Sequence, residues 1–304
     1  MRFRGTRTAK SSPSWETQGI PLSELQRRIC RLLAEERKRS GESYVAGGLA
    51  LNELLSGRRF SRDIDLFRDA QAALAASWAR DQASLTKAGL TVHVLRQVPS
   101  FVEAQITHDG ESALVQWVQD SAYSFFPLIE HPELGLTMHP VDLATNKLLA
   151  VAGRREARDW IEFLHCDLVV QPLGYLAWAA AGKDPGLNPT TIIEEAARTH
   201  YSQTEVDELE FDGPPPDAAA LGVRWRKAVA QARAIVAALP VEHVGKVVLE
   251  GRGLASATPE ELPRRLADLS FHAGRIRGTF PEIRELGPRE RASLARQDDD
   301  QGRE

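Results

Sequence analysis

The sequence predicts an α/β protein, with a small mixed β-sheet in the N-terminal half and a mainly helical C-terminal half. Residues 44–46 form a short apolar strand candidate that Gly47-Gly48 ends before a helix-prone run over 49–55. Residues 62–67 alternate polar and apolar side chains, as a strand with one buried face does. From Asp142 onward, apolar residues recur at helical spacing.

The remaining N-terminal elements follow from periodicity and turn residues. Apolar residues at helical spacing predict a helix from Ser23 to about Arg39, ended by Ser40-Gly41. A helical stretch over 70–86 precedes a strand over 91–95, and residues 113–118 form a further strand. These segments complete the predicted sheet and its flanking helices.

The C-terminal half contains five predicted helices, and Gly213-Pro214-Pro215-Pro216 interrupts them as a rigid break. The helices are expected over 143–152, 158–164, 175–181, 190–199 and 218–239. Residues 244–249 are expected to form a lone strand. The predicted organisation is a disordered basic arm (1–20), a first domain (21–140), a mainly helical domain (141–286) and a disordered tail (287–304).

Composition excludes several classes of protein. The chain has 304 residues and 42% hydrophobic content, enough for two modest domains. Its two cysteines form no disulfide framework and no zinc motif, which favours a reducing cytoplasm. No apolar run is long enough to cross a membrane, and none follows the basic N-terminus as a secretory signal requires. A net charge of −4 argues against general nucleic-acid binding.

The candidate chemistry lies in the alternating strand and in the glycine turn before it. Asp63 and Asp65 are two residues apart, so on a strand they project from one face and can share divalent cations with phosphates. Gly47 and Gly48 begin a helix, where backbone N–H groups and the helix dipole favour a triphosphate. Either motif alone is common in structural turns and strand ends, but together they describe one phosphate and metal site.

Two segments resemble a known family. VAGGLALNELLSGRRFSRDIDLF (45–67) resembles the nucleotidyltransferase signature of the AbiEii/AbiGii toxin family, which includes the MenT toxins and belongs to the DNA polymerase β-like superfamily. DLATNKLLAVAGRREARDWIEFL (142–164) resembles that family's second signature, and PLGYLAWAAAGKDPGLNP (172–189) is similar to the helical segment that follows. The resemblance covers roughly residues 40–200 and implies a polymerase β-like nucleotidyltransferase fold.

The resemblance also implies a reaction and further site residues. MenT-like members transfer a nucleotide from a nucleoside triphosphate to the 3′ end of tRNA, which blocks translation, with Mg²⁺ or Mn²⁺ held here by Asp63 and Asp65. Lys147 corresponds to the family's phosphate-contacting lysine, and Asp159 to its downstream acid, which positions the lysine or the acceptor. Such a toxin is normally encoded beside a cognate antitoxin.

Arginines cluster beside both motifs. Arg58, Arg59 and Arg62 precede the acidic strand, and we expect Arg62 to bind nucleotide together with Gly47, Gly48 and Lys147. Arg154, Arg155 and Arg158 surround the second motif, so the two basic clusters would flank one cleft. Solvated surface charges give an equally simple interpretation of each arginine taken singly.

One position departs from the superfamily pattern. Gln116 aligns where polymerase β-like enzymes place a third carboxylate, and an amide is a poor metal ligand and a poor general base. Asp120, Glu103 and Asp109 are candidate substitutes. Two alternatives therefore stay open: a nucleotidyltransferase acting on a protein or small-molecule hydroxyl, and a non-catalytic module that binds nucleotide or a partner.

Overall fold

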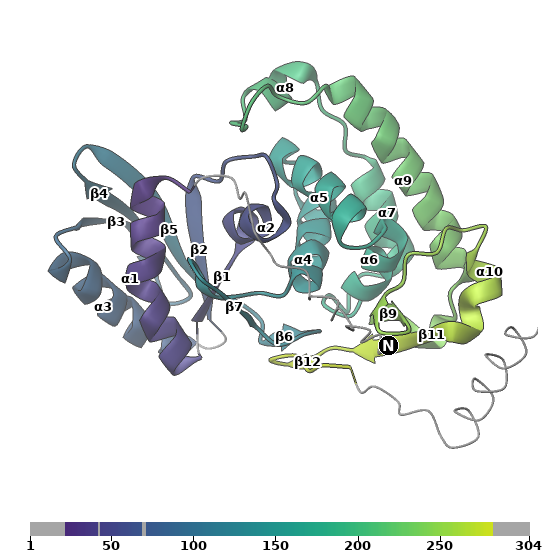
Figure 1. The fold of residues 1–304 in the computed structure, drawn as a ribbon, viewed down its shortest axis with the longest axis horizontal. Helices are drawn as coiled ribbons and strands as arrows, with labels where there is room; N and C mark the ends of the chain where they lie inside the picture. The colour runs from purple at the N-terminus through teal and green to yellow at the C-terminus, as the bar shows by residue number, and fades with distance from the viewer. Residues whose placement is uncertain (1–21, 42, 69–70, 282–304) are drawn as a thin grey trace, which may run out of the picture.

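A seven-stranded mixed sheet organises the N-terminal half of the computed structural model, which describes residues 22–41, 43–68 and 71–281 (Figure 1). The strand order is β3-β4-β5-β2-β1-β8-β7. These strands are β1 (Ser43–Ala46), β2 (Asp63–Arg68), β3 (Thr91–Val98), β4 (Phe101–His108), β5 (Glu111–Gln119), β7 (Ile129–His131) and β8 (Gly135–Thr137). The central strand β2 is antiparallel to β1 and parallel to β5, so the sheet is mixed as predicted.

Two helices, α1 (Glu24–Ser40) and α3 (Gln71–Lys87), pack on one face of this sheet. Ser23 caps α1 in a capping box and Gly41 ends it in the left-handed conformation, as the sequence predicts. Apolar side chains of the covered face, including Ile64 and Trp117, are buried. The opposite face of β4 and β5 carries only partly buried or exposed side chains.

Helix α2 (Gly47–Leu55) lies between the sheet and the helical half of the molecule (Figure 1). That half is built from α4 (Pro140–Gly153), α5 (Ala157–Val169), α6 (Leu173–Ala180), α7 (Pro189–Ala197), α8 (Gln203–Asp207) and α9 (Ala218–Ala238). One continuous apolar core joins side chains from the sheet, α2 and these helices. The helices therefore hold α2 and β2 in a fixed relation to α4 and α5.

The C-terminal part contains more strand than the sequence predicts. The expected lone strand over 244–249 is wrong, because β9 (Lys246–Glu250) is the centre of a three-stranded sheet with β10 (Gly253–Leu254) and β11 (Leu269–Ala273). Between β10 and β11, α10 (Leu262–Arg265) is a single turn. β12 (Arg275–Ile276) pairs with β6 (Tyr123–Ser124), which links the C-terminal part to the N-terminal half.

Other expectations have mixed outcomes. The predicted α/β class and the helices and strands named from the sequence are present, with ends shifted by a few residues. The sequence interpretation omitted strands β4, β6, β7 and β8, strands β10, β11 and β12, and the short helices α8 and α10. The expected arm (1–20) and tail (287–304) lie outside the described residues, and the boundary near residue 140 stays a prediction.

Both cysteines, Cys30 and Cys166, are buried and free. Within the ranges that the structure describes, no helix combines the length and the apolar character needed to span a membrane.

Candidate nucleotide and metal site

The two aspartates of β2 lie on the sheet face that α1 and α3 leave uncovered. Asp63 and Asp65 are partly buried, whereas Ile64 and Leu66 between and beyond them are buried in the core. β1 runs antiparallel beside β2 and places Ala46, the residue before α2, opposite Asp65. The strand therefore presents both carboxylates where α2 begins.

Gly47 lies directly against the Asp65 carboxylate. Its φ of +70° is left-handed, and a Cβ atom built on it would come within 1.9 Å of Asp65 Oδ2. A Cβ on Gly48 would come within 2.9 Å of Glu162 Oε1 on α5. Gly47 thus allows the β2 carboxylate to approach closely, and Gly48 allows the Arg59–Glu162 pair to do so.

Neither helix that begins at this site has a side-chain cap. α2 follows Ala46 and α5 follows Glu156, and no described side chain accepts a hydrogen bond from the first turn of either helix. The N–H groups of a first helical turn lack partners within the helix, and the helix dipole makes this end positive. Both helix starts are therefore suited to an anion such as phosphate.

The surroundings of Asp65 disfavour the ionised form of its carboxyl group. Burial raises its pKa to about 6, and the negative charge of Asp63 adds to this effect. The cationic side chains of Lys147, Arg158 and Arg154 act in the opposite direction without cancelling the rise. A cation placed between the two aspartates would relieve both the repulsion and the loss of hydration.

Lys147 of α4 lies in a buried charge network with α5. Its Nζ is 2.7 Å from Asp159 Oδ1 and 2.6 Å from Glu162 Oε2, and the residue is 8% exposed. Arg154 donates to Asp159 Oδ2 at 2.7 Å, and Arg59 Nε donates to Glu162 Oε1 at 2.7 Å. Three cations thus surround two carboxylates.

The pKa shifts show that this network is held in its charged form. Burial alone would lower the pKa of Lys147, but Glu162 and Asp159 hold it above its usual value. Burial alone would raise the pKa of each carboxyl. Lys147 and Arg154 instead lower the pKa of Asp159, and Lys147 and Arg59 lower that of Glu162.

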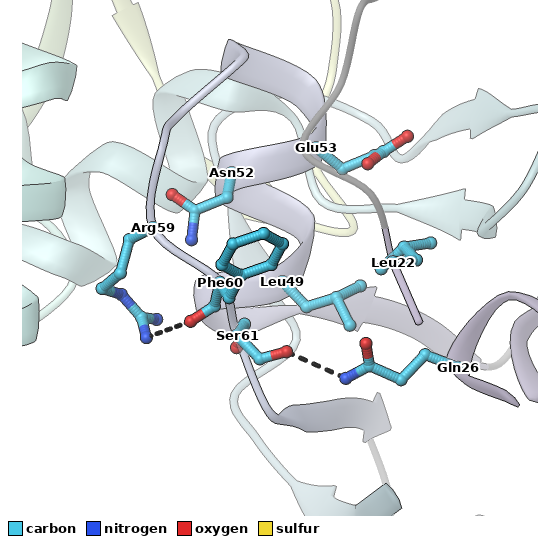
Figure 2. Close-up of a pocket in the computed structure, with 8 residues that line it drawn as sticks. All are labelled: Leu22, Gln26, Leu49, Asn52, Glu53, Arg59, Phe60 and Ser61. Atoms are coloured by element: carbon cyan, nitrogen blue, oxygen red, sulfur yellow. Dashed lines mark hydrogen bonds between the residues drawn. The ribbon is translucent and has the colours of Figure 1, made fainter. Parts of the chain in front are cut away.

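Arg59 belongs to the segment that joins α2 to β2 and connects it to α5. Its Nη1 donates to the Phe60 carbonyl at 2.6 Å, and Gln26 Nε2 from α1 donates to the Ser61 carbonyl at 2.8 Å (Figure 2). Asn52 of α2 also donates to Glu162 Oε1, at 3.1 Å. These bonds fix the start of β2, and hence Asp63, relative to α2 and α5.

One arginine of each predicted cluster contacts an element from the other motif. Arg158, in the first turn of α5, places Nη1 4.0 Å from Asp63 Oδ2 on β2, and Arg59 pairs with Glu162 on α5. That the two clusters flank one cleft stays a prediction. Arg62, predicted to bind nucleotide, is 76% exposed and forms an ion pair with Glu210. Among the described residues, Arg158 is therefore the arginine that forms an ion pair with one of the two aspartates of β2.

Sequence reasoning missed Glu162 and the role of Arg59. Glu162 follows Asp159 by three residues, which places both carboxylates on one face of α5. That spacing could have predicted the network, because two acidic side chains on an otherwise apolar helical face need buried cations as partners. The pairing of Arg59 with Glu162 spans 103 residues and has no local signal.

Gln116, predicted to stand in place of a third carboxylate, lies on the strand next to β2. In the parallel pairing of β2 with β5, Gln116 lies directly opposite Asp65. Of the candidate substitutes, Glu103 lies opposite Gln116 on β4, whereas Asp109 is in the β4–β5 turn and Asp120 follows the far end of β5. Only Glu103 is thus in register with the aspartate row.

The donor set fits a magnesium ion shared with a substrate. Asp63 and Asp65 are hard oxygen ligands, and Mg²⁺ usually takes one or two carboxylates together with waters and phosphate oxygens. Over the described ranges, no group of three or more His, Cys, Asp or Glu side chains could hold a metal ion alone. Asp63 and Asp65 would therefore hold the metal together with phosphates.

A groove of about 880 Å³ begins beside Asp63 and runs along the ends of β5, β4 and β3. Its walls carry Leu95, Leu114, Gln105 and other neutral side chains, and the pair of Arg62 and Glu210 also lines it. The groove leads to the aspartates without crossing the charge network of Lys147.

Comparison with known proteins places this geometry in a known fold. No protein-family model and no curated protein matches the sequence. Among solved structures, MenT4, a nucleotidyltransferase toxin from Mycobacterium tuberculosis H37Rv, has a TM-score of 0.50 at 15% identity over 72% of this chain and 83% of MenT4. JHP933 from Helicobacter pylori has a TM-score of 0.45 at 16% identity over 70% of this chain and 95% of JHP933. This chain therefore shares the overall fold of MenT4, in which a mixed sheet with flanking helices is followed by a mainly helical part.

Proposed function

We propose that this protein is a toxin-type nucleotidyltransferase that transfers a nucleoside monophosphate from a nucleoside triphosphate to an acceptor hydroxyl. The observation that carries the proposal is the contact between Gly47 and Asp65, which joins an uncapped helix start to a pair of carboxylates. One side of this contact suits phosphate and the other suits a divalent cation. A metal–triphosphate satisfies both at once.

Each element of the site has a task in this proposal. The N–H groups at the start of α2 bind triphosphate oxygens, and Arg158 turns from Asp63 to a phosphate when the nucleotide enters. Asp63 and Asp65 would hold the metal, and a metal bound there would offset negative charge on the phosphate oxygens. Lys147, fixed by Asp159 and Glu162, adds a permanent positive charge close to Asp65.

The proposed transfer is a single in-line displacement. A bond forms between the acceptor oxygen and the α-phosphorus, the bond from that phosphorus to the pyrophosphate oxygen breaks, and the hydroxyl proton passes to water. The chain contributes mainly orientation and charge, because its donors and carboxylates are already fixed by the contacts of α2, β2 and α5.

We propose the 3′ end of tRNA as the acceptor, with inhibition of translation in the cytoplasm as the consequence and an antitoxin as the regulating partner. The resemblance of residues 45–67 and 142–164 to the motifs of the AbiEii/AbiGii toxin family supports this acceptor. The direct test incubates the protein with each labelled nucleoside triphosphate, Mg²⁺ and total tRNA. The expected result is label on tRNA with wild type and none with Asp63→Ala/Asp65→Ala.

A matched control removes a carboxylate elsewhere on the same sheet. Glu111→Ala, at the exposed start of β5, is expected to transfer label as wild type does. Absence of label on any acceptor with wild type, or transfer that survives loss of both aspartates, would show that the proposed activity is wrong. Growth arrest on expression, relieved by the double substitution, tests the toxin part separately.

The groove beside Asp63 favours a second candidate acceptor. The charged side chains that line it are Arg62, Glu210 and Asp63, with no excess of positive charge, and such a surface attracts a polyanionic RNA backbone weakly. A protein or small-molecule hydroxyl would enter it without an electrostatic penalty. Label on protein or on a small hydroxyl compound, with none on RNA, would replace tRNA by this acceptor class.

A further inference from the structure

Three side chains stand in one row across the open sheet face beside the aspartates. Asp65 on β2 is in register with Gln116 on β5, and Gln116 is in register with Glu103 on β4. Residues directly opposite each other on neighbouring strands project from the same face. Gln116 therefore lies between a carboxylate that belongs to the metal pair and one that does not.

A hydrogen bond sets which way the Gln116 amide faces. Its Nε2 donates to Glu103 Oε1 at 3.0 Å. An ionised carboxylate only accepts hydrogen bonds, so Glu103 selects the nitrogen end of the amide and turns the carbonyl oxygen away from β4. The opposite direction is toward β2 and Asp65. Within the part of the chain that the structure describes, this carbonyl oxygen accepts no hydrogen bond.

Glu103 has no competing partner that would weaken this preference. Arg96 is opposite Glu103 on β3, but its guanidinium lies over the Phe101 ring, 5.5 Å from the centroid. No ion pair of Glu103 occurs among residues 22–41, 43–68 and 71–281. The Glu103 charge is therefore available to orient Gln116.

We propose that Glu103 is a positioning residue that holds the Gln116 carbonyl oxygen beside Asp65 as the hydrogen-bond acceptor for the incoming hydroxyl. The inference rests on the proposed transferase activity and names the groups that orient its acceptor. Gln116 contacts the substrate hydroxyl, whereas Glu103 acts through Gln116. The amide orients the hydroxyl without taking its proton, which passes to water as above.

The first experiment measures the hydrogen bond without requiring activity. In ¹⁵N-labelled protein, the side-chain amide signals of Gln116, assigned by their loss in Gln116→Glu, report the bond through their shift and their exchange with water. Glu103→Ala is expected to move these signals and speed their exchange, whereas Glu111→Ala leaves them in place. Unchanged signals in Glu103→Ala would overturn the inference.

The second experiment separates positioning from nucleotide binding. In Glu103→Ala, kcat for transfer is expected to fall at least about tenfold, because the hydroxyl loses a fixed partner. Calorimetric binding of Mg²⁺ with a non-hydrolysable triphosphate should change less than about twofold, since Asp63, Asp65 and the start of α2 are untouched. A parallel loss of both quantities would indicate a structural role and refute the positioning role.

The third experiment reverses the pair. Gln116→Glu alone places two like charges opposite each other and is expected to lower kcat and stability. Adding Glu103→Gln restores the bond with donor and acceptor exchanged, and recovers most of the rate. The double variant should also gain a new limb in its profile of kcat against pH, from the carboxylate now beside the hydroxyl.

The two proposals fail in distinguishable ways. If wild type and Glu103→Ala transfer nucleotide equally well, the proposed function stands and this inference is wrong. If wild type transfers nucleotide to no acceptor, both proposals are wrong. Failure of the double variant to recover more rate than Gln116→Glu would also count against the orientation of Gln116 by Glu103.

Discussion

Replacing Asp65 by asparagine should make the protein more stable at neutral and alkaline pH. Burial raises the pKa of Asp65 to about 6, and Asp63 contributes repulsion, so the ionised carboxylate is unfavourable in the folded protein. Asparagine keeps the shape of the side chain and removes the charge. A catalytic or binding group often lowers stability in this way, because its environment is built for a ligand.

The sign and size of the effect follow from proton linkage. Between the ordinary pKa of 3.8 and the folded value of about 6, the folded protein binds a proton that the unfolded chain releases. Stability therefore falls as pH rises through this window and stays reduced above it. A shift of this size corresponds to about 3 kcal/mol, and because Asp65 is only partly buried we expect about 1–3 kcal/mol in Asp65→Asn at pH 8.

Urea unfolding at pH 4, 6 and 8, in the presence of a chelator, measures this difference. The free energy of unfolding of Asp65→Asn should exceed that of wild type at pH 8, and this difference should shrink toward zero at pH 4. In Ser61→Ala, a neutral change close to the same strand, the free energy of unfolding should differ from that of wild type by the same amount at all three pH values. An Asp65→Asn variant that is less stable than wild type at pH 8, or whose offset ignores pH, would refute the electrostatic account. Mg²⁺ should stabilise wild type at pH 8 more than Asp65→Asn.

Three further predictions test other parts of the site. Lys147→Met should lower the free energy of unfolding by about 2–4 kcal/mol, because two buried carboxylates lose their shared partner. Lys147→Arg keeps the charge and should lower the free energy of unfolding less. Chemical denaturation measures both variants. Gly47→Ala should abolish transfer and metal binding, because the added methyl group clashes with Asp65. Gly89 has a similarly positive φ, but a Cβ there would meet no atom within 4 Å, so Gly89→Ala should only lower the melting temperature. Arg158→Gln should weaken triphosphate binding about tenfold in calorimetry, as expected for loss of one charge-assisted bond, and unchanged affinity would remove Arg158 from the phosphate site.

Local signals were sufficient to predict the elements that carry the site. The β1–glycine–α2 turn and β2 each follow from residues within a few positions of one another, and the structure has them where the sequence indicates. The omitted strand β4 alternates clearly, with Val102, Ala104 and Ile106 buried, but its other face carries Glu103 and Gln105 and lowers its apolar content. β7 and β8 have three residues each, too few for a period to be visible.

Long-range contacts explain what the sequence could not predict about the site. Lys147 and Asp159 were paired through a family motif, and the structure places them 2.7 Å apart. Glu162 and Arg59 complete the same network through a contact that depends on how α5 packs against the segment before β2. Glu103 was one of three candidates, and only the strand order β4-β5-β2 distinguishes it. The functional assignments of these residues remain predictions.

The charges around the site explain why a metal and a triphosphate should bind together. Lys147, Arg154 and Arg59 are each paired with Asp159 or Glu162, and in the described part of the chain none of the three forms an ion pair with a carboxylate of the sheet face. Asp63, Asp65 and Glu103 on that face have one cation in ion-pair range among the described residues, Arg158 at 4.0 Å from Asp63.

The carboxylates thus favour binding of a cation, whereas the uncapped starts of α2 and α5 favour binding of an anion. A metal ion without phosphate would face two positive helix ends, and a triphosphate without metal would face two carboxylates. Binding of either should therefore strengthen binding of the other, and calorimetry of Mg²⁺ with and without the nucleotide should show this coupling in wild type and not in Asp63→Ala/Asp65→Ala.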